Sequence, residues 1–337
     1  MKQRLFAEAI ALISCALIGI SPLSGKNDNK QEAEALFAKA RELCEIRCEG
    51  CPPYQLRSRL RLHVQNEIVE GSLDEYYVSN DHWRRVMQVP DWKLFVVEIK
   101  NNNSMHRASQ AQYPTYIESR LHSLMHFAGL LKAKAKDGKI SIRRTNAAGQ
   151  PLTCIIQKEK GFKTETCFDA LNGTLATVTE GNDDNSRTYE YSQYSSISGK
   201  QFPRLLRMKE QDRLFLEIEI EEINSQYEMR PALFIPPHDA RSWKSCDNPT
   251  MPEAISKPEP RYSAEARAAR VTGKVIVYVV VGPDGRAYNA TPIRAEDLSL
   301  ARNTLDTIER HWQFKPATCD GSPVPRGILV ETEFRLF

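Results

Sequence analysis

Strict alternation of apolar and polar side chains between Leu56 and Ile68 is the strongest constraint that this sequence places on its fold. Leucine, valine or isoleucine fills most even positions of this run, whereas the odd positions carry arginine, histidine, glutamine or glutamate. Successive side chains of a strand point to opposite faces of its sheet. The run therefore predicts an antiparallel sheet with one wet face and one covered face. Leu60, Leu62 and Val64 lie on the apolar face.

Strand-like runs continue along the next part of the chain, and two helical segments accompany them. The expected strands are Leu73–Val78, Trp83–Val89, Trp92–Lys100, Ile140–Arg144, Leu152–Lys158, Lys163–Asp169, Thr174–Glu180, Arg187–Tyr194, Phe202–Lys209 and Leu214–Ile223. Asn172-Gly173 between two of them is a strong hairpin signal. The segment from Gln31 to Cys48 is rich in Ala, Leu and Glu, and Thr115 to Leu131 has apolar residues at helical spacing, so both predict helices.

The segment from Gly273 to Phe337 forms a second, self-contained pattern. An apolar β-branched run, Lys274–Val281, is followed by the turn sequence Gly-Pro-Asp-Gly and a returning strand, Arg286–Ile293. Asp297 can cap an amphipathic helix, and the last strand is expected at Ile328–Phe337. A short Ala-rich helix, Ser263–Arg270, precedes this block, which gives the order helix, strand, strand, helix, strand.

This order and several spaced motifs resemble the C-terminal domain of TonB-type energy transducers. The matching residues are Arg261 to Arg267, Gly273-Lys274-Val275, Asp284-Gly285-Arg286, Trp312-x-Phe314-x-Pro316-Ala317 and Phe334-x-Leu336. The usual Tyr-Pro at the helix entry is Tyr262-Ser263 here. The resemblance implies a domain that offers a strand edge to an extended peptide of a partner, as TonB does to an outer-membrane transporter. Val330, Glu331, Thr332, Glu333 and Arg335 would then contact that partner.

Residues 30 to 225 resemble the LolA/LolB-like open β-barrel fold. The matching phrases are Gly71-x3-Glu75-Tyr76-Tyr77, His82-Trp83-Arg84-Arg85, Cys167-Phe168-Asp169, Gly173-Thr174-Leu175 and Tyr191-x2-Tyr194 followed by Gly199-x2-Phe202-Pro203. The expected fold is therefore α+β: an antiparallel LolA-like open barrel with helices, joined to a small TonB-like domain of the order α-β-β-α-β. An ordinary β-sandwich is the alternative for the first part.

Four segments follow from these boundaries. Residues 1–25 read as an export signal, because basic Lys2 and Arg4 precede an apolar core too short to span a membrane. An uncleaved inner-membrane anchor and a lipoprotein cleaved at Cys15 are the alternatives. Residues 26–226 would form the β-rich LolA-like domain, 227–251 a linker that contains proline, and 252–337 the TonB-like domain.

Cysteine spacing raises the question of a metal cluster. Cys44, Cys48 and Cys51 have the spacing of a radical-SAM motif, but they follow an export signal and no parallel α/β pattern accompanies them. An oxidised pair and one free thiol are expected instead. Two further disulfides are predicted in an oxidising compartment, Cys154 with Cys167 on successive strands, and Cys246 in the linker with Cys319.

Other chemistry-bearing residues have ordinary structural explanations. His122 and His126 have metal-ligand spacing, but the glutamate that a zinc protease needs after the first histidine is Ser123. The acidic run from Glu217 to Glu222 alternates with isoleucine, which predicts the wet face of a strand. The sequence shows no nucleophile–base pair and no phosphate loop, so we predict a protein that is not an enzyme and has no cofactor or metal.

The functional prediction is an exported periplasmic protein of the TonB family that binds partners by strand addition, in energy transduction or transport across the envelope. The partner would be an outer-membrane transporter or another envelope protein, and a homodimer is an alternative. The rival prediction is a carrier of lipid or lipoprotein that holds its ligand on Leu60, Leu62 and Val64, with the TonB-like domain as an adaptor. A net charge of +3 without a dominant basic cluster gives no argument for nucleic acid.

Overall fold

The computed structural model of this protein describes residues 25–64, 67–127, 131, 139–147, 149–159, 161–182, 186–226, 228–244, 246 and 249–336. The expected export signal lies outside this range except for Gly25, where helix α1 begins (Gly25–Cys44). None of the helices in the described ranges is both long enough and apolar enough to cross a membrane.

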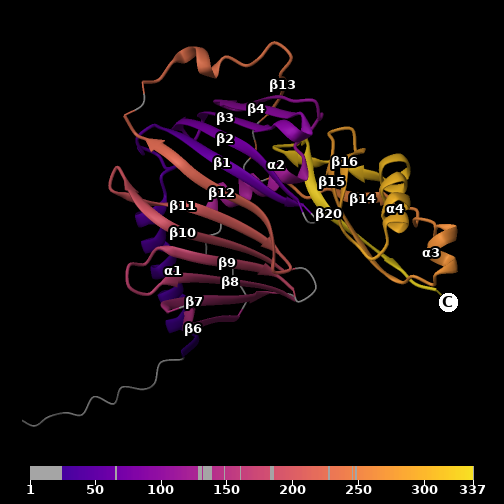
Figure 1. Ribbon diagram of the computed structural model, residues 1–337, viewed down its shortest axis with the longest axis horizontal. Coiled ribbons are helices and arrows are strands. Elements are labelled where there is room, and N and C mark those ends of the chain that lie inside the picture. Colours follow the sequence, from indigo (N-terminus) through magenta and orange to yellow (C-terminus); the bar gives the residue numbers. More distant parts are fainter. Residues whose placement is uncertain are drawn as a thin grey trace, which may run out of the picture.

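One large antiparallel sheet of 13 strands dominates the structure (Figure 1). Its strands along the chain are β1 (Tyr54–Val64), β2 (Glu67–Ser79), β3 (His82–Val89), β4 (Leu94–Asn101), β5 (Ser104–Ala108), β6 (Lys139–Ala147), β7 (Gln150–Glu159), β8 (Phe162–Asp169), β9 (Leu175–Gly181), β10 (Arg187–Ile197), β11 (Lys200–Glu210), β12 (Arg213–Asn224) and β13 (Arg241–Lys244). The chain starts in the middle of the sheet at β1 and runs outward to β5. It then crosses through helix α2 (Tyr116–Met125) to the far edge, β6, and returns strand by strand to β12 beside β1. The two ends of this order, β13 and β6, do not pair, so the sheet is open.

The long strand expected from Leu56 to Ile68 is two strands. Val64 pairs with Glu67 across a tight connection, so β1 and β2 form a hairpin and Ile68 is exposed. Paired residues of a hairpin share one face of the sheet. The inward-facing positions are therefore even in β1 and odd in β2, so the even-numbered Ile68 points outward. Strands β5 and β13, which carry mixed polar sequences, were not expected.

Helices α1 and α2 lie on the concave face of the sheet and close its core (Figure 1). Phe37 of α1 meets Phe168 edge-on with ring centroids 5.9 Å apart, and Leu121 and Leu124 of α2 are buried in the same cluster. A capping box fixes the start of α2, because Thr115 accepts from the backbone of Glu118 while the Glu118 side chain accepts from the Thr115 amide. Leu60 and Leu62 are fully buried in this core.

The C-terminal region has the element order expected from its motifs. Helix α3 (Ala264–Ala268) is followed by β15 (Gly273–Val281), β16 (Ala287–Ala295), α4 (Leu298–His311) and β20 (Arg326–Phe334), and the sheet order is β16-β15-β20. Asp297 caps α4 as expected, and Ser263 caps α3 in place of the missing proline. Two small two-stranded sheets complete the region: β14 (Glu253–Ser256) with β17 (Gln313–Lys315), and β18 (Ala317–Cys319) with β19 (Ser322–Val324).

The segment between the two regions is docked on both of them. After the short helix η3 (Pro231–Phe234), strand β13 pairs with β5 and extends the large sheet. Phe234 is buried against the ring of His82 at a centroid distance of 4.2 Å. Cys246 is then bonded to Cys319 of β18, and Lys244 pairs with Asp320 at 2.7 Å. The linker is therefore a fixed strap between the regions (Figure 1).

Candidate functional site

The outer edge of β20 is the first candidate site. Nine consecutive residue pairs join β20 to β15 without a register shift, from Gly273–Phe334 to Val281–Arg326. Among the described strands only β15 borders β20, so the other side of β20 carries backbone N–H and C=O groups that no strand pairs. Such an edge is a template for a further strand.

The opposite edge of the same sheet, β16, is a poor template. Its pairing with β15 shifts register twice, between Ile276 and Val277 and between Tyr278 and Val280. Pro292 removes a backbone donor from this strand, and Asn289 has a positive φ of 54°. Because bulges and proline interrupt a ladder, a partner strand would pair far better along β20 than along β16.

The side chains of β20 alternate between buried and exposed positions. Val330 and Phe334 are buried beneath the helices with Thr332 partly covered, whereas Leu329, Glu331 and Glu333 are exposed. Glu331 pairs with Lys274 at 2.8 Å, and Glu333 pairs with Arg335 at 2.7 Å. Of the five residues predicted to contact a partner, Val330 and Thr332 can therefore offer only backbone, and Glu331, Glu333 and Arg335 offer side chains.

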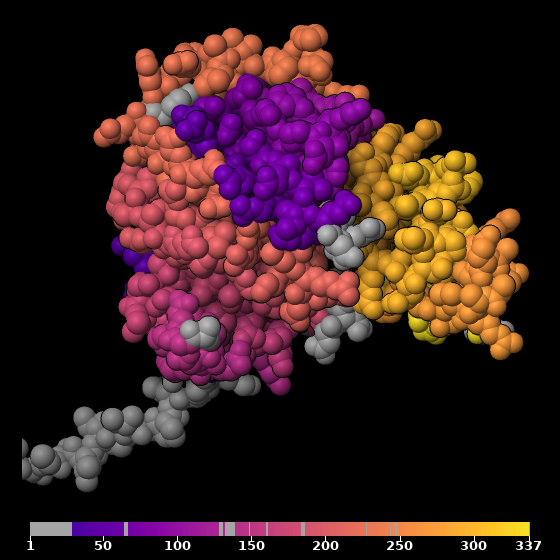
Figure 2. Space-filling model, in the orientation of Figure 1, coloured from indigo at the N-terminus to yellow at the C-terminus, as the bar shows by residue number. Residues whose placement is uncertain are grey.

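On the face of this sheet that points away from its helices, the part formed by β15 and β16 is covered by the N-terminal region, whereas Leu329, Glu331 and Glu333 of β20 stay exposed. Tyr278 of β15 packs against Tyr116 of α2 at a ring distance of 5.2 Å, and Tyr116 also meets Phe215 of β12. Tyr113 meets Tyr288 of β16 at 5.0 Å and accepts a hydrogen bond from Asn289 through its carbonyl. Figure 2 shows the resulting seam, where the yellow C-terminal surface lies against the rest of the chain. No sequence motif marked these aromatic residues as interface residues.

A cleft of about 740 Å³ opens beside this aromatic contact and is the second candidate site. Both regions line it, with Phe215 of β12 and Ile117 of α2 on one side and Ile293 of β16 on the other. Glu210 of β11 also lines the cleft and accepts a hydrogen bond from the Tyr116 hydroxyl. Burial raises the pKa of Glu210 to about 7.

His122 and His126 border a buried ionic cluster beside α2. His122 is exposed on this helix, and His126 is half-buried. Glu75, which is 1% exposed, pairs with Arg47 at 2.7 Å and with Arg85 at 2.8 Å. Arg85 also contacts His126 Nε2 at 2.6 Å and His122 Nδ1 at 3.3 Å. Arginine can only donate, so each imidazole accepts here and is neutral. Loss of water on the side that faces the cluster, and then the two guanidiniums, lower the pKa of His122 and hold that of His126 well below its usual range. Two cations beside these rings oppose metal binding.

Three disulfides join six of the cysteines that the structure describes. Cys154 joins Cys167 across β7 and β8, Cys246 joins Cys319, and Cys48 joins Cys51, so within the described residues Cys44 is the buried free thiol. Burial raises the pKa of the Cys44 thiol to about 11, so it is a poor nucleophile.

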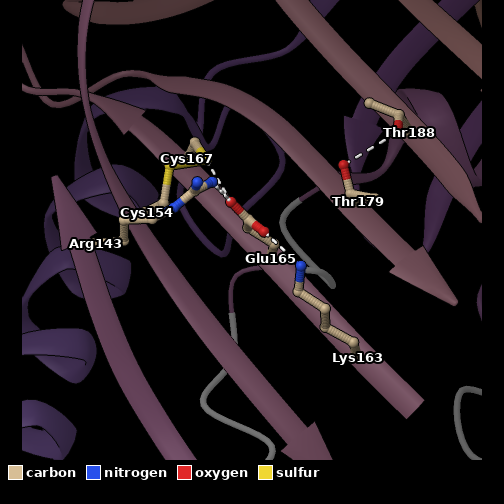
Figure 3. Close-up of a disulfide and its surroundings, with 7 residues drawn as sticks. All are labelled: Arg143, Cys154, Lys163, Glu165, Cys167, Thr179 and Thr188. Carbon is tan, nitrogen blue, oxygen red and sulfur yellow. Dashed lines mark hydrogen bonds and ion pairs between the residues drawn. A yellow bond between two sulfur atoms is a disulfide. The ribbon is translucent and has the colours of Figure 1, made fainter. Parts of the chain in front are cut away.

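Within the described residues, one group of cysteine and acidic side chains has its ligand atoms close enough to hold a metal ion: Cys154, Cys167 and Glu165. Figure 3 shows its two sulfurs bonded to each other and Glu165 held by Arg143 and Lys163.

The acidic run of β12 lies on the wet face of the sheet, opposite the arginines of β1. Arg59 pairs with Glu221 at 2.8 Å, and Arg61 pairs with Glu217 at 2.7 Å. Glu217 is the one buried member, and Arg207 reaches its second oxygen at 2.7 Å. These carboxylates are therefore ion-pair partners that tie β12 to β1 and β11.

The comparisons with known proteins agree on the C-terminal region. Residues 258–336 match the family described as Gram-negative bacterial TonB protein C-terminal. These residues form a TonB-like domain. Protein TonB of Escherichia coli (strain K12) is 33% identical over 85 residues, which are 25% of this chain and 34% of that protein. Protein TonB of Klebsiella pneumoniae is 33% identical over 88 residues, which are 26% and 34% of the two chains. The chain thus spans about a third of the curated relatives it matches.

Two solved structures resemble the part that precedes the TonB-like domain. A LolA superfamily protein from Nitrosomonas europaea is 12% identical and covers 60% of this chain and 97% of its own, with a TM-score of 0.40. A DUF1329 family protein from Desulfovibrio piger is 7% identical and covers 61% and 97%, with a TM-score of 0.43.

Proposed function

We propose that this chain is a non-enzymatic, exported protein of the cell envelope that binds an extended segment of a partner protein along β20. The partner class is an envelope protein such as an outer-membrane transporter, as the resemblance of the C-terminal motifs to TonB-type energy transducers implies. Binding would occur by strand addition, in which the backbone supplies affinity and the flanking side chains supply selectivity.

The free, regular edge of β20 carries this proposal. Nine residue pairs in unbroken register give its outward amides and carbonyls the regular alternation of an antiparallel ladder, and no proline interrupts Arg326–Phe334. The mixed charges of Glu331, Glu333 and Arg335 would favour a segment with both signs of charge opposite them. These charges also explain how a free edge avoids self-aggregation.

The contacts between the two regions favour a TonB-like domain that is held against the large sheet over one that is carried on a long extended linker. The strap carries β13 on β5, a disulfide to β18 and the Lys244–Asp320 pair, and the aromatic contacts of Tyr116 hold the sheet from behind. The rival function, a lipid carrier that uses the concave face, gains no support from Leu60 and Leu62, because core side chains already cover both.

Photo-crosslinking in cells tests the edge. A benzoylphenylalanine at Leu329, which points outward from β20, should capture the partner, whereas the same group at exposed Arg302 of α4 should not. Mass spectrometry then identifies the captured segment. Capture of a second copy of this chain would replace the transporter proposal with homodimerisation.

Two adjacent proline variants then test the backbone. Neighbouring residues of a strand direct their N–H groups to opposite sides, so one of Glu331→Pro and Thr332→Pro removes a bond to β15 and the other removes an outward donor. The variant that keeps the wild-type circular dichroism spectrum is the outward one. It should bind a synthetic copy of the captured segment at least tenfold more weakly. Unchanged binding by that folded variant would refute strand addition at β20.

A further inference from the structure

The cleft between the large sheet and the TonB-like domain has the size and lining of a ligand site. Its volume of about 740 Å³ lies within the range of roughly 300–1,000 Å³ that is usual for small-molecule pockets. Apolar side chains from both regions form its walls. They include Trp92, Ile117 and Phe215 on one side and Ile276, Ile293 and Leu298 on the other.

The charged groups of the cleft are mainly cationic. Arg187, Arg213 and Arg294 line it, and Glu210 is its one acidic residue. Arg187 is 3.1 Å from Glu180, which lies outside the lining, and 3.7 Å from Glu210, and Arg294 is 3.2 Å from Glu296. The exposed Arg213 makes no ion pair within the described residues. Burial raises the pKa of Glu210 to about 7, so this carboxyl carries only part of its charge at neutral pH.

A half-buried arginine behind the cleft adds a second, independent observation. The guanidinium of Arg120 stacks on the ring of cleft-lining Tyr116 at 5.1 Å. Its Nε is buried without a hydrogen-bond partner, and no carboxylate lies within ion-pair distance of it among the described residues. Burial, and next the charge of Arg187, lower the pKa of Arg120. Arg187 has acidic partners, but Arg120 and Arg213 have none within the described residues, which favours an anion from outside the chain.

We propose that this cleft binds an anionic amphiphile with a single long acyl chain. The chain would lie along the apolar walls, and the acidic head would lie by Arg187 and Arg213, where guanidinium groups form charge-assisted hydrogen bonds with a carboxylate or a phosphate. Because β15, β16 and α4 supply one wall, the bound molecule would touch both regions at once. The ligand would thus strengthen the contact between the sheet and the TonB-like domain. This inference does not depend on partner binding at β20.

Fluorescence titration of the full mature chain with cis-parinaric acid tests the proposal, with the methyl ester of the same molecule as the uncharged control. The acid should bind at least about tenfold more tightly than the ester, as expected for one charge-assisted hydrogen bond of about 1.4 kcal/mol. Arg213→Glu should remove this preference, and it should leave the fold intact because Arg213 is exposed. Equal binding of acid and ester by the wild-type protein would overturn the anionic head.

Bulky substitutions locate the ligand. Ile293→Trp, on the TonB-like wall, should weaken binding of the acid at least tenfold, and Ile255→Trp, on exposed β14 outside the cleft lining, should leave it unchanged. Unchanged binding by a folded Ile293→Trp protein, or no binding by wild type, would refute a site shared by the two regions. Competition by palmitate and by a lysophosphatidic acid then distinguishes a carboxylate head from a phosphate head.

Discussion

His122 and His126 should make this protein less stable in mild acid. Loss of water on the side that faces the ionic cluster, and then Arg85 and Arg47, lower the pKa of His122. In the unfolded chain an imidazole has a pKa of about 6.5. Between the lowered pKa and this value the unfolded chain binds more protons at His122 than the folded protein does. The free energy of unfolding therefore falls as the pH falls through this window.

The substitution His122→Gln isolates this effect and allows its magnitude to be bounded. Glutamine keeps an acceptor for Arg85 but does not titrate. Each pH unit below the unfolded pKa would cost about 1.36 kcal/mol for a fully buried imidazole, but His122 is exposed and water screens it from the guanidiniums. From about pH 7.5 to about pH 5 the variant should therefore lose up to about 1 kcal/mol less than the wild-type protein.

Glu210 changes the free energy of unfolding in the opposite direction as the pH falls, so the effect of His122 is read from the difference between the wild-type protein and His122→Gln. Burial raises the pKa of Glu210 to about 7, so the folded protein holds a proton there that the unfolded chain releases above its own, lower pKa. This group adds stability as the pH falls from about 7 towards about 4.5, and that stability is lost as the pH rises through about 7. Its contribution is the same in both proteins and cancels in the difference.

Urea denaturation at the two pH values, followed by near-ultraviolet circular dichroism, measures the effect. His311→Gln provides a matched control, because His311 is exposed at the end of α4 and stays in water in both states. If wild type and His122→Gln lose the same free energy of unfolding between the two pH values, His122 is not a neutral acceptor for Arg85 and the description of the ionic cluster is wrong.

Two further predictions concern stability. Burial by itself would raise the pKa of Glu75, but Arg47 and Arg85 outweigh it and hold the value at about 2, so Glu75→Gln should reduce the free energy of unfolding in urea by about 3–5 kcal/mol. Glu222→Gln, which breaks an exposed pair with Arg57, should reduce the free energy of unfolding by at most about 1 kcal/mol. Equal losses for Glu75→Gln and Glu222→Gln would contradict the prediction. Replacing Cys246 and Cys319 by serine opens a loop with a sequence separation of 73 and should cost about 4 kcal/mol, against about 1–2 kcal/mol for Cys48 and Cys51 with a separation of 3. A larger loss from the short loop, in calorimetry or urea, would show that chain entropy is not the main effect.

Local sequence determined the elements and part of the edge-strand site. Alternation in β20 separated buried Val330 from exposed Glu331, Asp297 marked the start of α4, and the hairpin of β7 and β8 brought Cys154 opposite Cys167. Each of these features depends on residues that are close in sequence or on the fixed period of a strand. The arginines of β1 and the glutamates of β12 can also be read from the sequence, although only the structure shows that Arg61 pairs with Glu217.

The tertiary structure alone decided which surfaces meet. Tyr116 and Tyr278 are far apart in sequence, and no local pattern distinguishes an aromatic residue at an interface from one in a core. His122 and His126 have metal-ligand spacing in the sequence, and only the structure places Arg47 and Arg85, from other elements, against them. The linker was recognisable by its prolines, but its strand β13 depended on a free edge at β5. These contacts are non-local, so their energies depend on the three-dimensional packing of elements that the sequence specifies only one at a time.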